Sequence, residues 1–334
     1  MTRGGPGDAA CAAGAPAAPG GDDAVRSRVV EVDGVPMSAL VCAVGRPRAA
    51  VVALHGGAAR AAYFHAPALA AQSLLLTGAA LGFTVIALDR PGYGASAPHA
   101  AGMDEPSRRV DLAYGAVDRL LGPDPAARGA GVFVVAHSLG SVLALRMAAD
   151  ERGADLLGLE LAGTGLRFDP RSADILEGRA RAVPEEGPQN GRRGLRDLLW
   201  GPERLYPERV EDRAAIASST PPYEGTEIRT WPRELPGAAA AVRVPVRYCL
   251  GDHERVWDAD PEAMAQVGAL FTASPRVVVD RQAYGPHNLS LGRSATAYHL
   301  KVLAFAEECV LARREAGFPG GRAAAAGDAA APGR

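Results

Sequence analysis

The sequence predicts an α/β fold in which a mostly parallel sheet is covered by helices on both faces. Short apolar, β-branched segments alternate along the chain with segments of helical spacing. The 334 residues, with 48% hydrophobic content, are enough to bury a large core. Such alternation is typical of parallel strands that are buried on both sides.

The predicted elements begin with a hairpin, formed by VRSRVVEVDG and SALVCAVG, and then alternate. Apolar β-branched runs predict strands, and apolar residues at helical spacing predict helices. The predicted strands are residues 49–57, 83–96 (which runs into a long turn), 133–135, 156–165, 244–251 and 276–280. The predicted helices are residues 68–82, 108–121, the stretch after residue 138, 261–271 and 294–314.

One long segment interrupts the alternation and divides the predicted core. Residues 166–241 are polar, rich in arginine, glutamate and proline, with short helical pieces such as RRGLRDLLW. A structureless loop of this length is unusual in a compact domain, so we interpret the segment as an inserted lid. The core then consists of residues 25–165 and 242–316. The low-complexity ends, 1–24 and 317–334, are predicted to be disordered.

Composition excludes several classes of protein. The net charge of −2 offers no attraction for nucleic acid or an anionic membrane. No window has the roughly 18 apolar residues of a membrane span, and the first two dozen residues lack the apolar run of a signal peptide. The four cysteines are far apart and form no CxxC pair. We therefore expect a cytoplasmic protein without a cofactor or metal; whether it forms a homodimer is left open.

A serine lies where a predicted strand meets a predicted helix. Residues 133–145 read FVVAHSLGSVLAL, and the apolar run stops at Ala136, two residues before Ser138. A tight strand-to-helix turn favours small residues two positions on either side, and Gly140 meets this requirement fully. Ala136 meets it with one methyl to spare. In isolation the motif is equally consistent with a structural serine.

Four motifs in one order resemble the α/β-hydrolase family over about residues 27–312. They are His55-Gly56-Gly57 after a strand, DRPGYGAS at 89–96, the turn at Ser138, and YGPHNL at 284–289. The resemblance implies a mostly parallel eight-stranded sheet with helices on both faces and an inserted helical lid. It also implies a nucleophile, a base, an orienting acid and donors for an oxyanion.

The resemblance assigns most of these roles to particular residues. Ser138 would attack an acyl carbonyl, and His287 would act first as base and then as acid. The backbone N–H groups of Leu139 and of Gly57 (or Ala58) would bind the oxyanion. His55 and His137 are expected to have structural roles, one supporting the oxyanion loop and the other supporting the turn at Ser138.

The acid that orients His287 has several candidates. Aligning VPVRYCLGDHERVW with the family pattern places Glu254 at the acid's position, and we favour it. Asp252 lies two residues earlier and could serve if the loop is shifted. Glu160, inside an apolar strand, is the least favoured.

Aromatic residues of the predicted lid are candidates for substrate binding. They are Trp200, Tyr206, Tyr223 and Trp231, in a chain with only 5% aromatics. They either line an acyl pocket or form a small core of the lid itself. Tyr63, just beyond the oxyanion loop, could reach the same cavity.

The leading hypothesis is a serine hydrolase that cleaves a small-molecule ester or thioester through an acyl-serine intermediate. The same three side chains also support an acyltransferase, a cyclase, or a C–C bond hydrolase or lyase. A non-catalytic binding protein on the same scaffold is the alternative from another class. Family members that open haloalkanes or epoxides have aspartate at the position of Ser138, which argues against that chemistry here.

Overall fold

A computed structural model describes residues 24–176, 189–208 and 215–317. The two terminal segments predicted to be disordered therefore lie, apart from residues 24 and 317, outside the described residues. The predicted lid, residues 166–241, is described in part.

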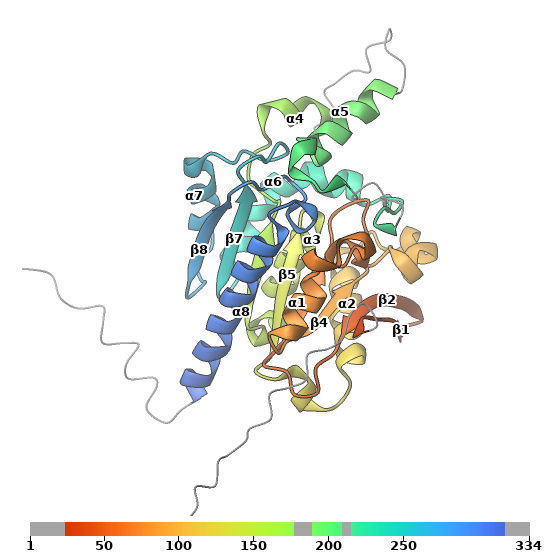
Figure 1. Ribbon diagram of the computed structural model, residues 1–334, viewed down its shortest axis with the longest axis vertical. Helices are drawn as coiled ribbons and strands as arrows, with labels where there is room; N and C mark the ends of the chain where they lie inside the picture. Colours follow the sequence, from red (N-terminus) through yellow and green to blue (C-terminus); the bar gives the residue numbers. More distant parts are fainter. Residues whose placement is uncertain (1–23, 177–188, 209–214, 318–334) are drawn as a thin grey trace, which may run out of the picture.

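The fold is built on one eight-stranded sheet with the strand order β1-β2-β4-β3-β5-β6-β7-β8 (Figure 1). The strands are β1 (Arg26–Val32), β2 (Val35–Cys42), β3 (Ala50–Leu54), β4 (Thr84–Leu88), β5 (Val132–His137), β6 (Gly158–Ala162), β7 (Val246–Gly251) and β8 (Val277–Gln282). The predicted hairpin β1–β2 is antiparallel, as is the pair β2–β4, and all other neighbouring strands are parallel. The predicted α/β architecture is confirmed.

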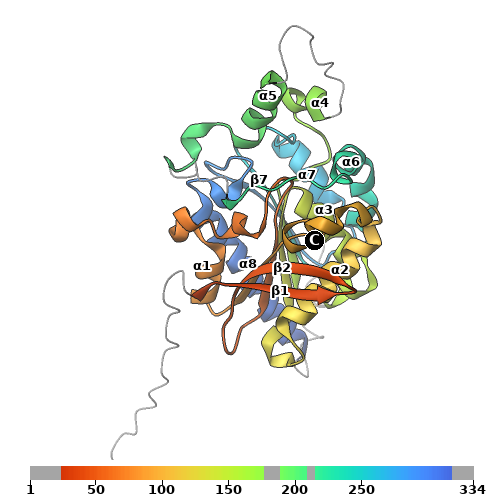
Figure 2. The same ribbon diagram turned by 90° about the vertical axis from the view of Figure 1, so that its right-hand side faces the viewer.

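Helices cover both faces of this sheet. The α-helices are α1 (Leu74–Ala80), α2 (Pro106–Leu121), α3 (Leu139–Ala149), α4 (Pro170–Leu176), α5 (Gln189–Trp200), α6 (Glu224–Ala240), α7 (Pro261–Ala269) and α8 (Ala295–Gly317). Short 3₁₀ helices are η2 (Ala61–Phe64), η3 (Pro67–Gln72), η4 (Gly94–Gly102), η5 (Pro125–Arg128), η6 (Glu151–Asp155), η7 (Glu203–Leu205) and η10 (Leu289–Leu291). Figure 2 shows α1 and α8 on one side of the sheet and α2 and α3 on the other.

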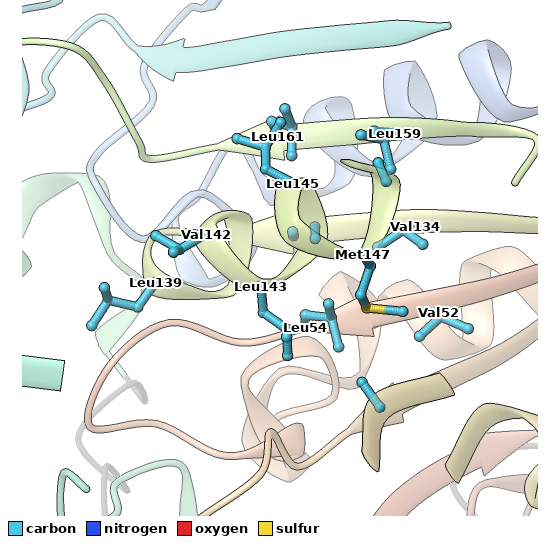
Figure 3. Close-up of a cluster of buried hydrophobic side chains, with 14 of the residues drawn as sticks. Val52, Leu54, Val134, Leu139, Val142, Leu143, Leu145, Met147, Leu159 and Leu161 are labelled. Carbon is cyan, nitrogen blue, oxygen red and sulfur yellow. The ribbon is translucent and has the colours of Figure 1, made fainter. Parts of the chain in front are cut away.

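The alternation of side chains along the strands divides the core into two layers. Val52 and Leu54 of β3 belong to the cluster shared with α2 and α3, whereas Val51 and Ala53 belong to the cluster shared with α1 and α8. Figure 3 shows side chains of α3 between the helix and the central strands. Each such side chain contributes roughly 1.5–3 kcal/mol when fully buried. This packing fixes the beginning of α3, where Ser138 lies.

The predicted helix over 68–82 is shorter in the structure. Residues 67–72 form the 3₁₀ helix η3, with non-helical backbone at Leu69, and α1 begins only at Leu74. Ser73 explains the boundary, because its hydroxyl accepts the Leu76 N–H at 3.1 Å and caps the new helix.

The segment between β6 and β7, residues 163–245, contains α4, α5 and α6 and is called the β6–β7 insertion below. Figures 1 and 2 place α4 and α5 beyond one end of the sheet. The sequence interpretation missed the length of α6, 17 residues, because Pro232 and Pro236 lie inside it. Burial of Trp231, Leu235 and Ala239 beside α3 offsets the missing backbone donors. The role of the insertion as a lid stays a prediction.

Candidate active site

Ser138 occupies a strained turn between β5 and α3. Its backbone has φ 53° and ψ −122°, a conformation that residues other than glycine rarely adopt. The Ser138 N–H donates to the Ala162 carbonyl of β6 at 2.8 Å. The neighbouring strand therefore holds the turn in this conformation.

The requirement for a small residue at position 140 is confirmed by the close approach of β3. A Cβ on Gly140 would lie 2.2 Å from the Leu54 carbonyl oxygen, a distance that no side chain can occupy. Ala136 is fully buried within β5, where a methyl group fits. Alanine at position 136 and glycine at position 140 therefore leave enough room for the turn at Ser138.

His287 and Glu254 form a buried pair. His287 Nδ1 lies 2.8 and 2.9 Å from the two carboxylate oxygens of Glu254. Glu254 Oε1 also accepts the backbone N–H groups of Val256 at 2.8 Å and Arg255 at 3.0 Å. Because a carboxylate only accepts, the ring donates through Nδ1–H, which leaves Nε2 as the atom that can take a proton.

The Glu254 carboxyl stays ionised in this environment. Burial raises its pKa, but the adjacent His287 ring, with its hydrogen bond, and the backbone N–H groups act in the other direction. Their sum holds the pKa of Glu254 below its ordinary value of 4.5. A negative charge therefore lies beside the imidazole at neutral pH.

The other two candidate acids are engaged elsewhere. Asp252 accepts the backbone N–H groups of Tyr284 and Gly285, each at 2.9 Å. Glu160 is buried in β6 and pairs with Arg247 at 2.7 Å. Of the three carboxylates, Glu254 is the one that the structure brings to the His287 ring.

The loop that carries His287 lies against the turn at Ser138. The ring of His137 donates through Nε2 to the His287 carbonyl at 2.9 Å, and the two rings are 4.9 Å apart. A Cβ on Gly163, which follows the Ser138 acceptor Ala162, would lie 3.3 Å from His287 Cε1. Within the described residues the Ser138 hydroxyl makes no hydrogen bond with His287; such bonds often form only when substrate is bound.

The loop after β3 presents an unpaired backbone donor beside this turn. A Cβ on Gly56 would lie 3.0 Å from Ser138 Cβ, so the loop lies directly against the turn at Ser138. Ala58 N–H is used by the Tyr93 hydroxyl at 3.1 Å. In the described part of the chain, neither the Gly57 N–H nor the Leu139 N–H has an acceptor. These are the two donors predicted for the oxyanion.

His55 supports that loop, as the sequence interpretation expected. Its Nδ1–H donates to the Gly56 carbonyl at 2.8 Å, and its Nε2 accepts the Arg90 N–H at 3.1 Å. Burial, followed by the charge of Arg90, holds the pKa of His55 well below its usual range. The ring is therefore neutral, consistent with one donating and one accepting nitrogen.

Two of the predicted substrate-binding residues, Tyr63 and Trp231, pack within the core. Tyr63 is buried and stacks on His137, with ring centroids 4.7 Å apart. Trp231 is fully buried, and its Nε1–H donates to Thr164 Oγ1 at 2.8 Å. Contact of either residue with substrate stays a prediction.

The other aromatics of the β6–β7 insertion have defined neighbours too. Tyr223 donates its hydroxyl to the Pro91 carbonyl at 2.8 Å. Trp200 is half-buried beside Tyr206, with ring centroids 5.6 Å apart. Both remain predicted substrate contacts.

Sequence reasoning missed one residue that bears on the loop after β3. Glu224, the first residue of α6, is buried and contacts both Arg90 and Tyr93. Arg90 and Tyr93 lie in the DRPGYGAS motif, but a single carboxylate within a polar segment carries no recognisable signal.

No helix in the described ranges is both long and apolar enough to cross a membrane. Among the same residues, no group of His, Cys, Asp and Glu side chains could hold a metal ion.

Comparison with known families decides the classification. The sequence matches the family model described as "Alpha/beta hydrolase family" over residues 51–316. The chain belongs to this family. The match covers most of the α/β-hydrolase core described above, including Ser138, Glu254 and His287.

Solved structures share the α/β-hydrolase fold at low identity. A carboxyl esterase from Bacillus coagulans is 20% identical, with a TM-score of 0.57, and 86% of this chain covers 99% of that one. Monoglyceride lipase from Saccharomyces cerevisiae is 14% identical, with a TM-score of 0.60 and coverages of 85% and 95%. The epoxide hydrolase VrEH1 from Vigna radiata is 19% identical, with a TM-score of 0.59 and coverages of 86% and 99%. No curated protein matches the sequence. At such identities the likeness shows the fold alone, so the reaction must be argued from the site.

Proposed function

We propose that this α/β-hydrolase is a serine hydrolase that cleaves a carboxylic ester or thioester through an acyl-Ser138 intermediate. The observation that carries the proposal is the buried His287–Glu254 pair, held against the strained turn of Ser138. A serine hydroxyl is a weak nucleophile at neutral pH and requires such a base.

The reaction has two steps that use the same side chains. In acylation, Ser138 Oγ forms a bond to the acyl carbon while its proton passes to His287 Nε2. The bond from that carbon to the leaving oxygen or sulfur breaks, and the proton moves from His287 to the leaving group. In deacylation, water gives a proton to His287 Nε2 and its oxygen bonds to the acyl carbon. The bond from that carbon to Ser138 Oγ then breaks, and the proton moves from His287 to Ser138 Oγ as the carboxylic acid leaves.

The charges of the site favour these steps. The ionised Glu254 stabilises the imidazolium that forms on His287, and its hydrogen bond keeps the proton on Nδ1. The Gly57 and Leu139 N–H groups stabilise the oxyanion, each by about 2.7–4 kcal/mol in the transition state.

Hydrolysis of p-nitrophenyl esters and acyl thioesters of increasing chain length tests the proposal, with Ser138→Ala and Ser141→Ala compared with the wild type. Ser141 is a matched control, because it lies one turn into the same helix and its hydroxyl donates to the Ala162 carbonyl at 3.0 Å. We expect Ser138→Ala to lower kcat/KM by about 10⁴-fold or more. Ser141→Ala should retain most of the activity. Equal turnover by wild type and Ser138→Ala would refute the proposal.

A further inference from the structure

Glu224, at the beginning of α6, is a buried carboxylate that joins the β6–β7 insertion to the loop after β4. It is 1% exposed. Its Oε1 accepts Arg90 Nη2 at 2.5 Å, and its Oε2 accepts the Tyr93 hydroxyl at 2.7 Å. Burial raises the pKa of Tyr93, so the hydroxyl remains protonated and donates. These three residues are called the Glu224 network.

The Glu224 network reaches both peptide groups that adjoin Gly57. Arg90 Nη2 also donates to the Gly56 carbonyl at 3.0 Å. On the other side, the Tyr93 hydroxyl accepts the Ala58 N–H at 3.1 Å. Gly57 itself lies close to the carboxylate, since a Cβ there would be 3.1 Å from Glu224 Oε2.

These contacts determine the direction of the Gly57 N–H. In a planar trans peptide the C=O and N–H point in opposite directions. Holding the Gly56 carbonyl with Arg90 and His55 therefore turns the Gly57 N–H the other way. Holding the Ala58 N–H fixes the next peptide plane, so Gly57 cannot rotate freely between them.

We propose that Glu224 is a positioning residue, which through Arg90 and Tyr93 holds the Gly57 N–H in the orientation needed to bind the oxyanion. This inference rests on the proposed function, because the oxyanion in question is the one that forms when Ser138 attacks an acyl carbonyl. It makes the β6–β7 insertion part of the oxyanion site, in addition to any role in binding substrate. An oxyanion donor is effective only if it is oriented before the reaction.

The same helix contains a matched control. Glu227 is also buried, 7% exposed, and pairs with Arg109 of α2 at 2.6 Å and with Arg146 of α3. It anchors α6 to the core as Glu224 does, but its ion pairs lie on α2 and α3, away from the loop at Gly57. If Glu224 only anchored α6 to the core, replacing Glu224 or Glu227 should change kcat to the same extent.

The test compares Glu224→Gln, Tyr93→Phe, Glu227→Gln and the double variants that combine each glutamate change with Tyr93→Phe. For each protein, kcat and KM for a p-nitrophenyl ester, the affinity for an alkyl boronic acid and the melting temperature are measured. The boronic acid forms a tetrahedral adduct with the serine and so reports on the oxyanion site.

We expect Glu224→Gln to lower kcat about tenfold or more, a part of the ~10²–10³-fold effect of losing a whole oxyanion donor. KM should change less than about twofold, and boronate affinity should fall with kcat, as expected for an interaction made in the transition state. Tyr93→Phe should act similarly, and the double variant should lose less than the product of the two effects. Glu227→Gln should lower the melting temperature while leaving kcat and boronate affinity within about twofold, and its effect should combine additively with Tyr93→Phe.

Equal losses of kcat in Glu224→Gln and Glu227→Gln, or a loss confined to KM with unchanged boronate affinity, would overturn the positioning role. If Glu224→Gln does not fold, Tyr93→Phe decides, because it keeps the ion pair and removes one hydroxyl; unchanged kcat and boronate affinity in that variant would overturn the role. A wild type that neither hydrolyses esters or thioesters nor binds the boronic acid would instead refute the proposed function.

Discussion

Two carboxylates of one loop, Glu254 and Asp252, support different parts of the neighbouring histidine loop. Glu254 accepts the Nδ1–H of His287, whereas Asp252 accepts the backbone N–H groups of Tyr284 and Gly285. The two residues are close in sequence and similar in charge. Glu254 therefore orients the imidazole ring, whereas Asp252 supports the backbone of the loop that carries it.

This difference predicts the result of removing each charge. If His287 is the base, Glu254→Gln can still accept the Nδ1–H but cannot stabilise the imidazolium. Loss of the acid's charge in the Ser-His-Asp triad of serine proteases lowers kcat by about 10⁴-fold, and we expect a loss of that order here. Asp252→Asn retains one accepting oxygen and loses the second, so it should mainly lower the melting temperature. Measuring kcat/KM and melting temperature for both variants checks this. A larger loss of kcat/KM in Asp252→Asn would show that the roles are reversed.

At this scale the sequence predicted much of the candidate site and failed where no pattern exists. Ser138 and His287 lie in motifs with fixed neighbours, and Glu254 follows from counting residues after a glycine. Glu224 has no such neighbours, because its role depends on where α6 packs. A buried ion pair between distant segments leaves no local signal.

At the scale of elements, the loops after β7 and β8 meet at glycines. A Cβ on Gly251, the last residue of β7, would lie 2.1 Å from the Gly285 carbonyl oxygen. The His253 N–H donates to that same carbonyl at 2.9 Å. The loop with the candidate acid and the loop with the histidine are therefore held in direct backbone contact.

Gly251→Ala should separate these loops. We expect a loss of stability of roughly 1–3 kcal/mol, typical of overpacking, together with lower kcat/KM because Glu254 moves away from His287. Gly45→Ala is the control, since a Cβ there meets no atom within 4 Å. Thermal unfolding and ester hydrolysis of both variants provide the comparison. Equal behaviour of the two variants would mean that the close approach has no consequence.

The sequence predicts helices and strands correctly where their apolar residues form a clear pattern. It fails where contacts between distant segments override the preference of the local sequence. Strand β3 is apolar along its whole length, and β5 is apolar up to Ala136, which makes both strands recognisable in the sequence. The helix α6 continues through two prolines because its apolar side is buried, which local rules cannot anticipate.

At the scale of the whole molecule, strand order assembles the candidate site. Ser138 follows β5, Glu254 follows β7 and His287 follows β8. These strands belong to the parallel series β5-β6-β7-β8 of the sheet. Carboxyl ends of parallel strands meet at one edge, where sites of α/β proteins form. The order of motifs therefore predicted convergence of residues that are far apart in the chain. The arrangement of α4, α5 and α6 did not follow from the sequence, since insertions have no common pattern.

The most direct test of the account is covalent modification by a fluorophosphonate, followed by peptide mass spectrometry. We predict a single adduct on the peptide that contains Ser138, formed far more slowly in His287→Ala, because the serine then lacks its base. Modification at another residue, or at Ser138 with the same rate in wild type and His287→Ala, would contradict it.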